Sequence, residues 1–182
     1  FALSSDTLGS KSTAIGEQAL STQNFTTATD SHNTAIGFKA GLAVTTGLRN
    51  TIVGSLAGDA LTDADDNVAI GVESLSTDTQ GSGSTAIGHG TLTAQNFTTA
   101  TTSYNTAVGY NAGTSITTGT SNTIVGSNAG DALTTGADNV AIGNFALSAE
   151  DTTGRNIAIG RNSLLLANST SGNANNVAVG YN

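Results

Sequence analysis

Apolar and polar residues follow one short pattern that recurs along the whole chain. The pattern is Asn or Ser, a β-branched residue, Ala or Ile, Ile or Val, and then Gly. Its first copies read STAIG from residue 12, NTAIG from residue 33 and NTIVG from residue 50. β-branched residues bounded by Asn or Ser and by Gly are typical of short strands. Each copy therefore predicts one strand.

The copies are regularly spaced, which identifies an internal repeat. They start at residues 12, 33, 50, 67, 84, 105, 122, 139, 156 and 176, so the steps are 17 residues or 20 to 21 residues. Four steps sum to 72, and residues 12–83 match residues 84–155 at 43 of 72 positions. We interpret residues 1–182 as a single repeat array with these two super-repeats and with partial repeats at 1–11 and 156–182. Phe1 falls inside a repeat and the chain contains no Met, so we expect a fragment of a longer fibrous protein.

The length of the repeat selects the fold. Helical-pair repeats need about 33 residues or more, and no 3.6-residue apolar stripe occurs here. A second short segment after each Gly, such as Ala19-Leu20, is expected to form a second strand before a polar loop. The sequence thus predicts an all-β fold, a parallel β-roll or β-solenoid of about ten coils of 17–21 residues. Stacked at about 4.8 Å per coil, the rod would be about 48 Å long.

The two apolar places in each strand point to opposite faces, because side chains alternate along a strand. In NTAIG, Thr34 and Ile36 share one face, whereas Asn33, Ala35 and Gly37 share the other. One face can line the interior of the coil, and the other needs a partner, since so small a chain has no second layer. We therefore expect a homotrimer, intertwined or side by side, with the fourth-place residues in the core or the interface. These residues are Ile15, Ile36, Val53, Ile70, Ile87, Val108, Val125, Ile142, Ile159 and Val179.

Two further places are nearly constant and are expected to be structural. An invariant Gly indicates positive φ or a backbone approach that excludes Cβ, and these residues are Gly16, Gly37, Gly54, Gly71, Gly88, Gly109, Gly126, Gly143, Gly160 and Gly180. The Asn residues are expected to bond turn backbone groups and to stack as a ladder. They are Asn33, Asn50, Asn67, Asn105, Asn122, Asn139, Asn156 and Asn176.

One variable place lies two residues after the Gly. The segments NTIVGSLAGDAL at residues 50–61 and NTIVGSNAGDAL at residues 122–133 differ only where Leu56 becomes Asn128. A place that accepts both an apolar and a polar side chain is expected in a turn, with the side chain directed to solvent.

Composition narrows the function. The net charge is −8 with only five Lys and Arg residues, which argues against nucleic acid and anionic membranes as partners. No apolar run approaches the about 20 residues of a membrane span, so we expect no membrane insertion in this segment. There is no Cys and therefore no thiolate chemistry. Only 10% of residues are charged, which together with the regular repeat argues against disorder.

The sequence offers only weak candidates for a metal-binding or catalytic site. Asp63, Asp65 and Asp66 could suggest a Ca²⁺ loop, but they match neither the EF-hand spacing nor the glycine-aspartate nonapeptide of calcium β-rolls, and a solvated loop is the preferred interpretation. His32 and His89 occupy different places in the repeat, and a general base would need fixed partners. We expect no catalytic site, no metal, no cofactor and no enzymatic activity.

The two 21-residue units contain the segment QNFTTAT, at residues 23–29 and 95–101. The extra residues should bulge from the rod. Phe25 and Phe97 are therefore candidates for surface recognition of a glycan or receptor, and the alternative is that each Phe folds back to cover a gap or a subunit seam.

With the repeats aligned, the chain resembles the head repeats of YadA-like trimeric autotransporter adhesins. The Asn or Ser, Ala, Ile or Val and Gly of each copy carry the resemblance, together with the Ala or Ser three residues after the Gly. Similar repeat arrays occur in phage tail fibres. The resemblance implies a left-handed parallel β-roll, three chains around one axis, and adhesion at a surface. The units of the adhesin heads are shorter than those of this chain.

These observations predict a non-enzymatic structural and adhesive fibre module, extracellular, on a virion tail fibre or a bacterial surface. Its polar loops would present contacts for a glycan or protein receptor on a host. Two alternatives stay open: a self-assembling extracellular filament subunit, and an ice-binding solenoid. The second requires uniform Thr rows, yet the second place holds Val68, Val140, Ile157 and Val177 among the Thr residues.

Overall fold

A computed structural model describes residues 1–149, 152–165 and 174–181, and every regular element in these ranges is a β-strand. Ten three-residue strands coincide with the ten copies of the core pattern. They are β2 (Thr13–Ile15), β4 (Thr34–Ile36), β5 (Thr51–Val53), β6 (Val68–Ile70), β8 (Thr85–Ile87), β10 (Thr106–Val108), β11 (Thr123–Val125), β12 (Val140–Ile142), β13 (Ile157–Ile159) and β14 (Val177–Val179).

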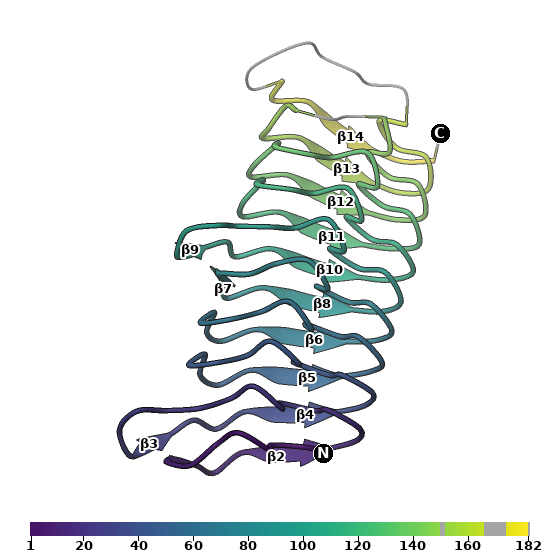
Figure 1. Ribbon diagram of the computed structural model, residues 1–182. Coiled ribbons are helices and arrows are strands. Elements are labelled where there is room, and N and C mark those ends of the chain that lie inside the picture. Colours follow the sequence, from purple (N-terminus) through teal and green to yellow (C-terminus); the bar gives the residue numbers. More distant parts are fainter. Residues whose placement is uncertain (150–151, 166–173, 182) are drawn as a thin grey trace.

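The ten strands form one parallel sheet in which each strand pairs with the next copy of the repeat (Figure 1). The register brings equivalent residues together, for example Ala35 beside Ile52 and Ile36 beside Val53. The described N-terminal end and the C-terminal strand β14 lie at opposite ends of the resulting rod (Figure 1). The predicted all-β parallel solenoid is confirmed.

Two additional two-stranded parallel sheets mark the long coils. β1 (Gly9–Ser10) pairs with β3 (Thr29–Asp30), and β7 (Gly81–Ser82) pairs with β9 (Thr101–Thr102). The extra residues of these coils extend the chain beyond the width of the 17-residue coils, on the side from which the strands of the main sheet start (Figure 1). We call residues 23–30 and 95–102 the bulges.

The interior of the rod is thin and filled by one side chain from the third place of each strand plus a few from the turns. The third-place residues of β4 to β13 are fully buried, and all are Ala except Ile52 and Ile124. The place four residues after the invariant Gly is either Leu or Gly, and the core is filled differently in the two cases. Leu20 and Leu75 fill the core themselves, whereas Gly58 leaves space that Leu61 and Ile52 occupy.

The expected second strand does not form. The segments after each Gly, such as residues 17–22 and 38–43, are turns. Two residues of each turn have positive φ, for example Gln18 at 58° and Leu20 at 48°, and left-handed residues cannot continue a strand. The backbone still bonds along the rod, since Leu20 N–H donates to the Ala40 carbonyl at 3.1 Å. The turns therefore stack without being strands.

The variable place two residues after the Gly lies in this turn. Leu56 and Asn128 have φ of 57° and 54°, and both side chains are half-exposed. Asn adopts this conformation more readily than other residues with a Cβ. Because neither side chain fills the core, the exchange of Leu for Asn leaves the packing intact.

Candidate functional site

The invariant glycines form a row in which neighbouring backbones touch. Their φ lies between 122° and 145°. A Cβ on Gly37 would lie 2.5 Å from the carbonyl oxygen of Gly54, and one on Gly126 would lie 2.6 Å from that of Gly143. Both the conformation and the space therefore require Gly. The same geometry holds from Gly16 to Gly160, whereas Gly180 has the conformation but no neighbour within 4 Å of its ideal Cβ.

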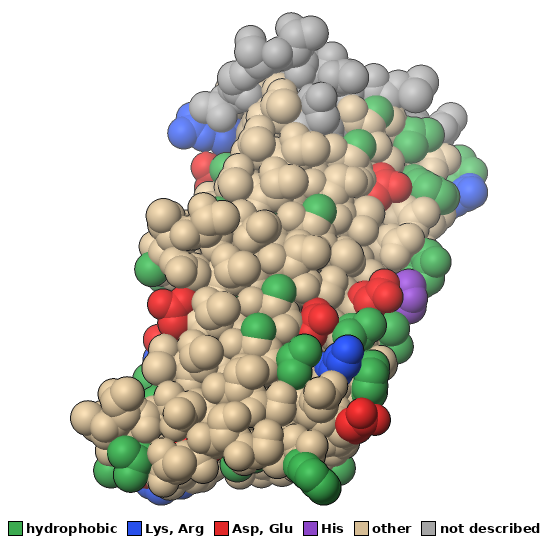
Figure 2. Space-filling model, viewed as in Figure 1, with side chains coloured by type: hydrophobic (Ala, Val, Ile, Leu, Met, Phe, Trp, Pro, Cys, Tyr) green, Lys and Arg blue, Asp and Glu red, His purple; other side chains and the backbone are tan. Residues whose placement is uncertain are grey.

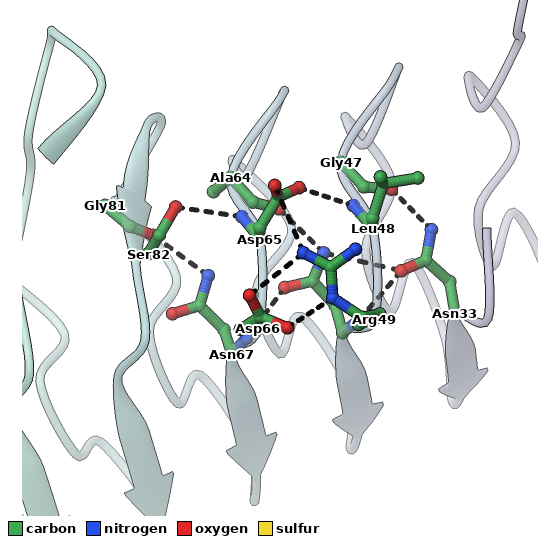
Figure 3. Close-up of polar contacts among 11 residues, drawn as sticks. Asn33, Gly47, Leu48, Arg49, Ala64, Asp65, Asp66, Asn67, Gly81 and Ser82 are labelled. Carbon is green, nitrogen blue, oxygen red and sulfur yellow. Dashed lines mark hydrogen bonds and ion pairs between the residues drawn. The ribbon is translucent and has the colours of Figure 1, made fainter. Parts of the chain in front are cut away.

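The Asn residues form a buried ladder along the rod (Figure 3). Asn50 donates from Nδ2 to the Ala64 carbonyl at 2.7 Å, and its Oδ1 accepts from the Asn67 backbone N–H at 3.0 Å. Asn33 donates in the same way to the Gly47 carbonyl at 2.7 Å. From Asn33 to Asn139, each Asn side chain of the ladder thus satisfies one backbone group of its own coil and one of the next coil. Buried backbone groups without partners would cost about 1–3 kcal/mol each, so the ladder stabilises the stack.

The other side of the main sheet is open to solvent. We call this side, made of the second- and fourth-place side chains, the outer face. It consists of Thr13, Thr34, Thr51, Val68, Thr85, Thr106, Thr123, Val140, Ile157 and Val177, together with Ile15, Ile36, Val53, Ile70, Ile87, Val108, Val125, Ile142, Ile159 and Val179. The fourth-place residues are therefore not in the core of the chain, because alternation directs them away from the buried Ala or Ile beside them.

The exposure of the outer face is unusual for its composition. Ile36 and Ile159 lie inside the stack, with strands on both sides, yet each is 37% exposed. None of the twenty side chains is charged, and fourteen are Val or Ile. A sheet face that remains in water usually alternates with polar residues. The outer face is thus a continuous band of β-branched side chains that runs along the main sheet.

The face of the molecule seen in Figure 2 is different. Over the middle of that face the apolar side chains appear as separate spots among polar side chains and backbone, and further apolar side chains gather along its right-hand edge. Exposed apolar residues scattered singly are ordinary, whereas a contiguous patch marks an interaction site. The outer face is therefore the best candidate for a functional surface.

Aromatic and charged side chains border the outer face. Just after the Gly row, His89 stacks on Tyr110 with ring centroids 5.2 Å apart, and Lys39 Nζ lies 5.1 Å from the ring centroid of Phe38. His32 lies on the opposite border, beside Asn33, and is exposed. The two histidines therefore lie apart on different borders and do not form a shared site.

Arg49 pairs with two of the three carboxylates in the acidic loop of Asp63, Asp65 and Asp66 (Figure 3). Arg49 Nε donates to Asp66 Oδ1 at 2.6 Å and Nη2 lies 3.5 Å from Asp65 Oδ2. The hydrogen bond from Arg49 holds the pKa of Asp66 below its ordinary value. Asp65 also accepts from the Leu48 backbone N–H at 2.8 Å, whereas Asp63 is exposed. The carboxylates of Asp65 and Asp66 thus both contact Arg49 and stabilise the loop.

Phe25 and Phe97 are not exposed contact points, which corrects the surface-recognition hypothesis. They are 5% and 7% exposed. A Cβ on Gly81 would lie 2.8 Å from Phe97 Cδ2, so the ring covers the backbone of β7, the strand that pairs with the bulge. An aromatic ring next to a thin core gains more from covering the coil than from solvent exposure. The alternative interpretation, in which each Phe folds back over a gap, describes the structure.

A buried polar network under each bulge was missed by the sequence analysis. Gln95 Nε2 donates to Asp78 Oδ2 at 2.6 Å and to Ser84 Oγ at 3.0 Å, while Asn105 Nδ2 donates to Gln95 Oε1 at 2.8 Å. Asp78 also accepts the backbone N–H groups of Gly81 and Phe97, both at 3.0 Å. The one available signal was that Gln precedes Asn-Phe-Thr in both long units. The network anchors the bulges to the rod.

Within the described ranges, no three His, Cys, Asp or Glu side chains come together to hold a metal ion, and no helix is long and apolar enough to cross a membrane. Comparison with known proteins found no matching family model, no matching curated protein and no matching solved structure. The functional argument therefore depends on the geometry of the outer face.

Proposed function

We propose that this chain is a non-enzymatic module of an extracellular homotrimeric fibre, in which the outer faces of three copies pack around a common axis. The observation that carries the proposal is the continuous uncharged band of Val, Ile and Thr side chains on the outer face, which a single chain leaves partly in water. The fold itself does not require this band to be apolar. Removing it from water would contribute about 25 cal/mol for each Å² of apolar surface.

The shape of the outer face suits this occupant. A strip about 48 Å long and about three residues, or about 10 Å, wide offers about 480 Å² from each chain, so three chains would together contribute about 1,400 Å². Each of the three pairwise contacts would then be smaller than a standard two-chain interface, so the three contacts would have to form together around the axis. The absence of charge from the band also matters, because copies that each carry a net charge of −8 repel one another least where the contacting surface is neutral. The likeness of the repeats to trimeric adhesin heads agrees with this arrangement.

A trimer of such rods gives reach and stiffness and presents three copies of every bulge and loop. These loops are rich in Thr, Ser and Asn, which suits weak polar contacts to a glycan or protein receptor on a host surface. Several weak contacts on one rigid rod reinforce one another through effective concentration. We propose adhesion of this kind, on a virion tail fibre or a bacterial surface, as the role of the module.

Measurement of the molar mass in solution tests the proposal. Light scattering after size exclusion is expected to give three chain masses for the wild type. Val108→Glu, which adds a charge to the centre of the band, is expected to give one chain mass. Thr118→Glu adds the same charge at an exposed loop of the same coil and is expected to leave the trimer intact. A wild type that is monomeric at every concentration would refute the trimer.

A further inference from the structure

Each bulge displays the tripeptide Asn-Phe-Thr, at residues 24–26 and 96–98. This is an Asn-X-Thr sequence, the acceptor pattern for N-glycosylation. In both copies the Asn and the Thr are exposed, while the Phe between them is buried. The buried ring therefore holds the tripeptide on the rod, and the two side chains that a transferase must recognise face solvent.

The hydrogen bonds leave the acceptor amide free. Asn24 and Asn96 accept at Oδ1 from the hydroxyls of Thr7 and Thr79, at 3.2 and 3.3 Å. Neither Nδ2 donates a hydrogen bond to another described residue. By contrast, Asn50 in the ladder uses its Nδ2 to hold a buried carbonyl. Attachment of a sugar at the bulge amides would therefore break no hydrogen bond that the fold needs.

The distribution of the tripeptide does not simply follow from a chain rich in Asn and Thr. A ladder Asn can never start it, because the residue two places later is the core Ala or Ile. The more accessible Asn111, Asn128 and Asn144 are followed at that place by Gly, Gly and Ala. In the part of the chain that the structure describes, the pattern occurs only on the two bulges. A third copy at residues 168–170 lies outside the described residues.

We propose that Asn24 and Asn96 are N-glycosylation acceptor sites. The co-substrate would be a sugar activated at its anomeric carbon by a nucleotide or lipid diphosphate. In the transfer the amide Nδ2 bonds to that carbon, the bond from the carbon to the phosphate oxygen breaks, and the diphosphate leaves as an anion. The amide proton passes to a base of the transferase, so no oxidant or reductant is needed.

The positions of the two sites suit a modified fibre. They lie 72 residues, or four coils, apart and therefore about 19 Å apart along the rod. The bulges project beside the start of the strands (Figure 1), so a sugar on either need not cover the outer face. Regularly spaced glycans would shield the loops of the long coils and leave assembly through the outer face unchanged.

In vitro transfer to the folded chain tests the sites. The purified protein is incubated with a transferase specific for Asn-X-Ser/Thr and with a nucleotide-activated glucose, and peptide mapping by mass spectrometry locates each added hexose. We expect modification of Asn24 and Asn96. Asn24→Gln and Thr26→Ala should each abolish the hexose at the first bulge only, whereas Thr26→Ser should retain it. Asn144, in the sequence Asn-Phe-Ala, serves as the unmodified control.

The same reaction on the denatured chain separates accessibility from sequence. Equal modification of folded and denatured protein at both bulges supports the proposal. Modification of the denatured chain alone would show that the fold hides the sites and would overturn it, as would a lack of modification in both states. Circular dichroism of Asn24→Gln, which should match that of the wild type, excludes a folding defect. The molar mass of the modified protein is recorded separately, so a failure of the trimer would not be mistaken for a failure of the sites.

Discussion

The third and fourth places of each strand are neighbours in sequence and experience opposite constraints. The third place faces inward, is fully buried from β4 to β13, and changes from Ala to Ile only where glycines make room. Ile52, for example, packs over the space left by Gly41 and Gly58. The fourth place faces outward and alternates between Ile and Val without any such compensation.

The difference separates what the fold requires from what it tolerates. Inside the rod, volume is fixed by the spacing of the coils, so a larger side chain needs a smaller one nearby. On the outer face the side chains remain partly in water, where a polar side chain would be tolerated, and yet every fourth-place side chain is apolar. A constraint that the single chain does not explain points to a contact outside it, which is the basis of the proposed trimer.

The largest expected effect concerns the row of invariant glycines. Gly126→Ala places a Cβ 2.6 Å from the Gly143 carbonyl at a φ of 139°, so both strain and a backbone clash oppose it. We expect a loss of at least about 3 kcal/mol in the free energy of unfolding, measured by chemical denaturation. Gly180→Ala is the matched control, because its φ of 145° is similar but its Cβ meets nothing. Equal losses in the two variants would show that conformation alone, without the clash, demands Gly.

The next prediction compares the loss of stability on substitution of two adjacent residues of β11. Ile124→Ala empties the core and should destabilise the chain by about 2–5 kcal/mol at any protein concentration. Val125→Ala removes outward surface and should cost less than about 1 kcal/mol in the dilute single chain. In an assembled trimer the cost of Val125→Ala should rise, and the melting temperature should depend on protein concentration. A concentration-independent melting temperature for the wild type would contradict assembly through this face.

Much of this comparison could be predicted from the pattern of the sequence. The repeat length, the β-branched residues and the invariant Gly predict a parallel solenoid, and alternation correctly separates Thr34 and Ile36 from Asn33 and Ala35. The second strand was predicted wrongly, because residues such as Leu20 adopt positive φ, which is uncommon for a residue with a Cβ. The hydrophobic pattern does not reveal this choice between a strand and a stacked turn.

The side chains of the long coils were harder to predict. A Phe in a Thr-rich insertion has the composition of an exposed contact, and its burial depends on how the bulge folds back over Gly81. The Asp78 and Gln95 network likewise joins residues 17 positions apart that only stacking brings together. Such contacts depend on the register of neighbouring coils, which composition alone does not indicate.

The smallest expected effect concerns a carboxylate whose charged form is disfavoured by burial. Asp59 lies in the turn after β5, and its Oδ1 is buried without a hydrogen bond among the described residues. Desolvation raises its pKa above 3.8, despite a nearby Lys39 that lowers it. Because the folded-state pKa is raised, the charged form weakens the fold: stability is fully present below the unfolded value and is lost as the pH rises through the folded value.

Asp59→Asn removes that charge at constant shape. We expect it to be more stable than the wild type at pH 7 by less than about 1 kcal/mol, because the residue is only half-buried, and the difference should vanish below about pH 4. Urea denaturation at a series of pH values measures the difference, with the exposed Asp63→Asn as control. A loss of stability at pH 7 instead would mean that the favourable contacts of the carboxylate within the chain, with its own backbone and with Lys39, outweigh the cost of its desolvation.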